Sequence, residues 1–219
     1  MNFDATFRGA LAQTEATPVQ LEEAATTRIQ AALVIAGGAC TGALMGTYAL
    51  WNDGPLVFAL WSAIKVPLLL GVSGALCFPI LRVLSFLLGI GDEFGVATRA
   101  LLGVSATFAC VLASLSPSTL LIYASGASYH GALGWNILLW VFAATVAGIR
   151  AKQKLAPQLK RERRLRILGA WGFALWAFVA IQAGWTLRPF IGRPNAKPQF
   201  LRRDALSNVY VGLGRLTGL

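Results

Sequence analysis

The sequence predicts an all-α protein: a polytopic transmembrane helix bundle with about five spans and additional interfacial helices. Of the 219 residues, 56% are hydrophobic and only 13% are charged, which is about half the charged fraction of a typical soluble domain. Apolar runs of about 20 residues recur along the chain, and this is the length that crosses the hydrocarbon core of a bilayer. A surface facing water needs more charge than this composition supplies, so we do not expect a soluble globular protein.

Changes in composition divide the chain into three parts. Residues 1–28 are polar and mildly acidic, residues 29–187 hold the transmembrane helices, and residues 188–219 form a basic C-terminal tail. Thr17 before Pro18 is a typical helix start, so an amphipathic helix is predicted to lead into the membrane. The N-terminus lacks the ordered basic, apolar and cleavage-site regions of a signal peptide, and we expect no cleavable signal.

The first span is predicted at 29–50, and glycines recur along it at four-residue spacing, at Gly38, Gly42 and Gly46. Small residues at this spacing share one helix face and let two backbones approach closely, which is how helices associate in lipid. The pattern predicts a helix-packing or oligomer interface. It leaves open whether the partner is another helix of the same chain or a second copy.

The segment 55–90 is nearly all apolar but is interrupted by charges and prolines, at Lys65, Pro67, Pro79 and Arg82. We interpret it as a short interfacial helix over 56–64, followed by a span that runs to about residue 84 and is kinked at Pro79. A re-entrant pair is the alternative. Lys65 is expected to snorkel to the headgroups from the start of this span.

The remaining spans are predicted at 97–115, 132–149 and 167–187. Ser116 and Pro117 are expected to end the first of these. The connection that follows, 116–131, contains no Lys, Arg, Asp or Glu and is apolar enough to dip into the interface.

The charge distribution predicts the orientation. The segment from Arg150 to Arg166 holds eight Lys or Arg residues against Glu162 alone, so it is predicted to be a cytoplasmic loop. Five spans then place the N-terminus in the cytoplasm and the C-terminus on the opposite side of a bacterial inner membrane. The net charge of +10 lies mostly beside apolar spans, which favours anionic lipid headgroups over nucleic acid as the partner.

The C-terminal tail delivers a second basic segment to the opposite side of the membrane, which orientation alone does not explain. Lipid or partner contacts are therefore expected at Arg188, Arg193, Arg202 and Arg203.

The sequence shows no convincing catalytic constellation. His130 is the only histidine, no carboxylate lies deep in a span, and the spacing of the three cysteines, Cys40, Cys77 and Cys110, fits neither a metal site nor a disulfide. We therefore expect no enzyme, no catalytic residues, no cofactor and no metal. Charges and amides near the hydrocarbon can mark a polar path or an interhelical contact, and the candidates are Lys65, Arg82 and Gln182.

Two short segments, AIKVPLLL at 63–70 and GWTLRPFIG at 184–192, resemble small bacterial multi-pass proteins with Yip1-like organisation. The resemblance implies five spans with termini on opposite sides, and a non-enzymatic role. The expected function is a structural or assembly subunit of a membrane complex, with itself or other membrane proteins as partners. The alternative is a small channel or transporter for an ion or small solute.

Overall fold

The computed structural model describes residues 18–90, 94–161, 163–188, 190–192 and 200, and these contain helices and no strand. The elements are α2 (Pro18–Gly46), a 3-10 turn η1 (Leu50–Asn52), α3 (Val57–Leu87), α4 (Phe94–Ala124), α5 (Tyr129–Arg161) and α6 (Arg163–Leu187). All five α-helices are long and apolar enough to cross a membrane. The predicted all-α, five-span architecture of a multi-pass membrane protein is confirmed.

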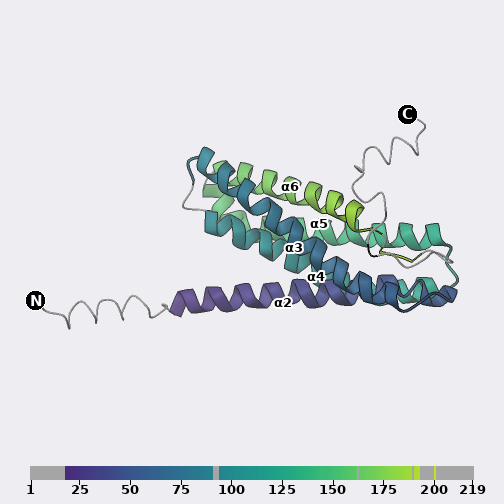
Figure 1. Ribbon diagram of the computed structural model, residues 1–219. Helices are drawn as coiled ribbons and strands as arrows, with labels where there is room; N and C mark the ends of the chain where they lie inside the picture. The colour runs from purple at the N-terminus through teal and green to yellow at the C-terminus, as the bar shows by residue number, and fades with distance from the viewer. Residues whose placement is uncertain (1–17, 91–93, 162, 189, 193–199, 201–219) are drawn as a thin grey trace, which may run out of the picture.

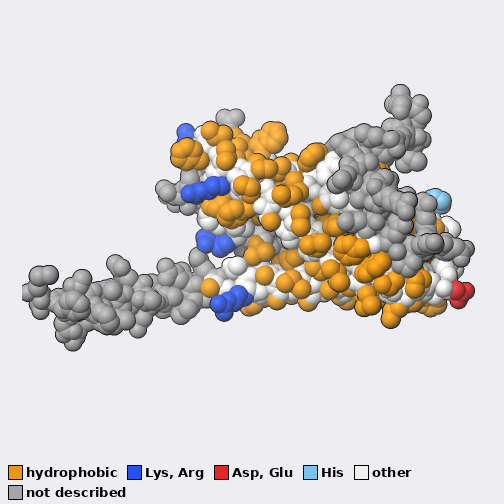
Figure 2. Space-filling view, viewed as in Figure 1, with side chains coloured by type: hydrophobic (Ala, Val, Ile, Leu, Met, Phe, Trp, Pro, Cys, Tyr) orange, Lys and Arg blue, Asp and Glu red, His pale blue; other side chains and the backbone are white. Residues whose placement is uncertain are grey.

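The helices form an antiparallel bundle in which α3 and α4 are central. In Figure 1, α2 lies along one side and packs on α3 and α4, while α5 and α6 lie on the other side. The helices α2, α4 and α6 end, and α3 and α5 begin, at one end of the bundle, which is called the cap end below. At the opposite, basic end, Figure 2 shows several Lys and Arg side chains, whereas the acidic and histidine side chains visible in this view lie at the cap end.

The chain over 57–87 is one continuous helix, α3. The predicted separate interfacial helix over 56–64 is therefore wrong, and so is the re-entrant alternative. Pro67 and Pro79 both lie inside α3. A broken helix in lipid would expose several backbone N–H and C=O groups, which costs more than the single hydrogen bond that each proline removes.

The prediction that Ser116 and Pro117 end the third span is also wrong, because α4 continues to Ala124. Pro117 has no N–H for the carbonyl of Ala113, one helical turn earlier. The Ser116 hydroxyl donates to that carbonyl instead, with an O–O distance of 2.7 Å. The backbone acceptor is satisfied, and the helix passes through the proline.

The basic segment 150–166 is helical rather than a loop, apart from residue 162, which is outside the described residues. α5 reaches Arg161 and α6 begins at Arg163. Lysine and arginine are good helix formers, so a charged run outside the hydrocarbon does not by itself stop a helix. The predicted surface helix after residue 200 and the turn residues 91–93 lie outside the described part of the chain.

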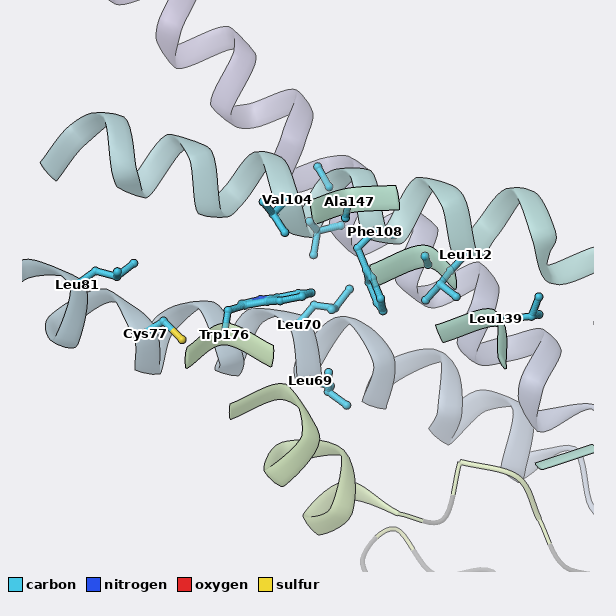
Figure 3. Packing of buried hydrophobic residues seen from close by; sticks show 14 of the residues in the cluster. Leu69, Leu70, Cys77, Leu81, Val104, Phe108, Leu112, Leu139, Ala147 and Trp176 are labelled. Carbon is cyan, nitrogen blue, oxygen red and sulfur yellow. The ribbon is translucent and has the colours of Figure 1, made fainter. Parts of the chain in front are cut away.

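The core is apolar through the middle of the bundle. Figure 3 shows Leu69 and Leu70 of α3 and Phe108 of α4 close to Trp176 of α6. The Phe108 and Trp176 rings meet edge to face, with 5.6 Å between their centres. Outward faces carry large exposed apolar side chains, as expected of a surface that lipid covers.

Candidate functional site

The two segments that carry the family resemblance meet in space at the cap end. Ser62, one residue before the first segment, donates from its hydroxyl to the Phe190 carbonyl in the second, at 2.5 Å. A methyl group added at Gly184 would lie 3.4 Å from Leu69 Cδ1. The first segment lies on α3, and the second spans the end of α6 and the chain that follows it. This meeting point is the candidate site.

Lys65 lies at the centre of this site and is fully buried, with 0% of its surface exposed. Its Nζ lies 5.0 Å from the centre of the Phe200 ring, and Phe200 also meets Trp61 edge to face at 6.0 Å. The prediction that Lys65 snorkels to the headgroups is wrong, because the side chain is buried and lies against the Phe200 ring. A buried cation within a transmembrane span is energetically costly, so the position of Lys65 makes this part of the bundle a candidate for a functional role.

The chain after α6 fills a socket that the other helices form. Ile191 is buried with Met45, Tyr48, Tyr123 and Ala132, which come from α2, α4, α5 and the turn after α2. At Gly192 the fit permits no side chain, because an added methyl group would lie 2.8 Å from Phe58 Cγ and 2.9 Å from Ala49 Cβ. This segment is called the return segment (190–192) below.

A buried tyrosine–asparagine network lines the same socket. The Asn136 amide donates to the Tyr123 hydroxyl at 2.8 Å and to the Ala132 carbonyl at 2.7 Å. The Tyr123 hydroxyl donates to the Met45 carbonyl at 3.3 Å. Tyr48 packs edge to face on Tyr123 with 5.1 Å between ring centres. Two of these hydrogen bonds join different helices, from Asn136 of α5 to Tyr123 of α4 and from Tyr123 to Met45 of α2.

Sequence reasoning missed this network, and although it singled out the segment 184–192, it did not predict that residues 190–192 pack back on α3. One signal was available: Asn136 is a lone amide within an apolar span, and such a residue usually bonds a neighbouring helix. Nothing in the local sequence indicates that Tyr123 would be its partner.

The glycine face of α2 packs inside the chain. A methyl group at Gly38 would lie 3.2 Å from the nitrogen of Pro67, and one at Gly42 or Gly46 would collide with backbone atoms of Ser62 or Ala59. All three glycines therefore meet α3. Of the two partners that the pattern left open, the structure selects a helix of the same chain.

The three candidates for a polar path do not come together. Lys65 and Arg82 both lie on α3, but about 26 Å apart along its axis, near opposite ends. Arg82 is exposed, with its guanidinium carbon 4.8 Å from the centre of the Phe94 ring. Gln182 is half-buried on α6. Between the two charges, the inward face of α3 carries Leu70, Cys77 and Leu81.

Of the four tail arginines, only Arg188 is among the described residues. Its guanidinium carbon lies 3.5 Å from the centre of the Trp185 ring, so it stacks on its own chain. The contacts expected for Arg193, Arg202 and Arg203 lie outside the described part of the chain and stay predictions.

No group of three or more His, Cys, Asp or Glu side chains that would hold a metal ion is present in the described ranges. His130 is exposed in the first turn of α5, and Cys40, Cys77 and Cys110 are free thiols on three different helices. The polar side-chain groups at the candidate site are one amine, several hydroxyls and one amide.

No protein-family profile, curated protein or solved structure matches the chain. The Yip1-like resemblance thus stays a prediction that rests on the two short segments.

Proposed function

We propose that the chain is a non-enzymatic integral membrane protein that acts as a structural or assembly subunit of a membrane complex. One observation carries the proposal: the five spans are unequally covered. Within the apolar stretch of α6, only 17% of the residues are buried. The buried share is 28% in the apolar stretch of α5 and 39% in that of each of the other three spans. A second membrane protein, or a second copy, would cover this α5–α6 face.

The chemistry of the cap end supports a non-enzymatic role. The Ser62 hydroxyl, the Asn136 amide and the Tyr123 hydroxyl each bond a group of another helix or loop. Other buried serines, such as Ser73 and Ser105, bond the preceding turn of their own helix. Groups engaged in this way stabilise the fold and are not poised to act on a substrate.

The assembly proposal is tested by photo-crosslinking in native membranes. A photoreactive amino acid at Phe178 or Ile181, both exposed on α6, is expected to capture a protein partner. Leu68 and Leu76 of α3 are similarly exposed and serve as matched controls that should capture only lipid. The mass of the adduct distinguishes a second copy from another protein. Equal protein capture at both helices, or none at α6, would contradict the proposal.

The basic end is proposed to face the cytoplasm of a bacterial inner membrane, since cations are retained on that side. α2 begins at this end and the return segment lies at the other, so the two termini would face opposite sides. In a variant without the three native cysteines, Lys152→Cys should react with an impermeant thiol reagent only from the cytoplasmic side. Asp53→Cys should react only from the other side. The reverse labelling pattern would overturn the orientation.

The buried Lys65 favours one alternative, a small channel or transporter, because charges inside the membrane often lie on solute pathways. Under this alternative, Lys65→Met should abolish solute flux in liposomes while the protein stays folded. The buried side chains between Lys65 and Arg82 on α3 are apolar apart from Ser73, whose hydroxyl bonds its own helix, and this weighs against it. Assembly is therefore the preferred function.

A further inference from the structure

The amine of Lys65 is enclosed by protein near the cap end of the bundle. None of the Lys65 surface is exposed, and its Nζ lies 5.0 Å from the centre of the Phe200 ring. An aromatic ring attracts a cation but carries no net charge that could neutralise it. A buried charge without a counter-ion is costly, both in a protein interior and in a membrane. The burial of Lys65 therefore requires an anion within reach of this amine.

The carboxylate side chains that the structure describes are too far from Lys65 to supply this anion. They belong to Glu22 and Asp53. Glu22 lies near the start of α2, at the basic end, whereas Lys65 lies near the cap end. Asp53 is exposed before α3 begins, and Lys65 lies about 12 Å along α3 from the first residue of that helix.

The chain connectivity assigns all but one of the remaining carboxylates to the basic end. They belong to the segment that precedes or begins α2 and to the connections from α3 to α4 and from α5 to α6: Asp4, Glu15, Glu23, Asp92, Glu93 and Glu162. Lys65 lies about 33 Å along α3 from the basic end of that helix. The exception is Asp204, which is the only acidic residue of the tail 188–219.

The position of Phe200 brings Asp204 within reach of Lys65. Phe200 contacts both the Lys65 amine and the Trp61 ring, so the tail passes directly over this part of α3. Asp204 lies outside the described residues, four positions after Phe200. Side chains four positions apart on a helix are neighbours, with about 5–6 Å between their Cβ atoms. Even a fully extended chain of four residues spans no more than about 14 Å.

We propose that Asp204 is the counter-ion of Lys65, and that the pair latches the C-terminal tail onto α3 at the cap end. The ion pair neutralises the enclosed amine and determines where the tail leaves the bundle. Arg202 and Arg203 would occupy other sides of a helix that begins near Phe200, so they would stay available to lipid headgroups. The latch is independent of the assembly proposal, because Lys65 lies on α3 and not on the α5–α6 face.

A double-mutant cycle on the full chain tests the latch by denaturation in detergent. Asp204→Asn leaves the Lys65 charge buried without its partner and should lower the folding equilibrium constant by at least about 100-fold. Lys65→Met should cost far less, because methionine suits an apolar site and the Asp204 carboxylate can then turn to water. Adding Lys65→Met to Asp204→Asn should restore most of the stability, even where Asp204→Asn alone fails to fold.

Asp53→Asn is the matched control, because Asp53 is an exposed carboxylate at the same end of the bundle. It should leave the stability unchanged, and its effect should add to that of Lys65→Met without coupling. Repeating the cycle in mixed micelles with and without phosphatidylglycerol tests the headgroup phosphate as a rival counter-ion. We expect the loss in Asp204→Asn to be the same in both.

Three results would overturn the latch. A loss in Asp204→Asn no larger than that in Asp53→Asn would mean that Asp204 does not pair with a buried charge. Failure of Lys65→Met to relieve the loss in Asp204→Asn would mean that Asp204 acts on another group. Recovery of Asp204→Asn with phosphatidylglycerol, together with a wild type that also needs this lipid, would assign the counter-ion role to the headgroup.

Discussion

The α2–α3 and α5–α6 interfaces join sequence neighbours by different means. At the first, glycines of α2 bring its backbone against the backbone of α3 at Ser62 and Ala59. At the second, the two helices are separated by a single residue, yet they share few contacts, and the closest approach at a glycine is the Phe173 ring beside Gly148. Adjacency in sequence therefore does not predict how closely two spans pack.

The difference between the two interfaces follows from the lipid that surrounds the helices. Lipid tails are as apolar as leucine, so burial in a membrane bundle brings little hydrophobic gain, and close van der Waals contact decides which helices associate. The glycine-rich pair meets this requirement. The α5–α6 pair lacks such close contact, and its outer face is available to lipid or to a partner protein.

The sharpest test of the close interface is Gly42→Ala. The added methyl group collides with the Ser62 carbonyl oxygen, which belongs to the backbone and cannot turn aside. We expect a loss of about 3 kcal/mol in the free energy of unfolding, measured by denaturation in detergent. Gly71→Ala is the control, since no atom lies within 4 Å of its added methyl group, and it should cost nothing. Equal stability of the two variants would refute the close packing.

A smaller effect is expected where α3 holds the return segment. Ser62→Ala removes the hydroxyl that donates to the Phe190 carbonyl and should cost about 1–2 kcal/mol, with faster proteolysis near residue 190. Ser73 is equally buried on α3, but its hydroxyl bonds the Leu69 carbonyl of its own helix. Ser73→Ala should therefore be close to neutral. If both serines behave alike, the return segment is not held by this bond.

The link between α4 and α5 should be weaker still. A double-mutant cycle with Asn136→Ala and Tyr123→Phe isolates the hydrogen bond between these side chains. Interhelical bonds of this kind in membranes contribute about 0.6 kcal/mol on average and at most about 1.7 kcal/mol. Additive effects of the two substitutions would mean that the side chains do not interact.

The smallest effect is expected at the loose interface. Gly148→Ala places a methyl group against the far end of the Phe173 ring, which can move aside, so the change in unfolding free energy should stay below about 1 kcal/mol. The same denaturation experiment measures it beside Gly42→Ala. A loss as large as that of Gly42→Ala would mean that α5 and α6 pack as tightly as α2 and α3, and the comparison would fail.

Much of the fold could be predicted because the bilayer imposes simple rules on sequence. Long apolar runs identified all five spans, and the end of the fifth at residue 187 was predicted correctly. Prolines and charges were poor guides to helix ends. Pro67, Pro79 and Pro117 lie inside helices, and the basic segment after Arg150 continues as helix to Arg161.

The candidate site was predicted in its parts but not in its arrangement. Lys65, the glycines of α2 and the segment 184–192 were each singled out from sequence. Their contacts join positions more than a hundred residues apart, as in the bond from Ser62 to Phe190. No local pattern specifies which distant segment covers a buried lysine.

The sequence by itself determined the class of protein, the number of spans and the accumulation of cations at one end, because these follow from hydrophobic length and charge in any bilayer. Only the tertiary structure decided that the glycine face is internal, that Lys65 is buried and that residues 190–192 pack back on α3. Those outcomes depend on which surfaces fit at atomic distance. In lipid, shape rather than hydrophobicity selects among apolar faces.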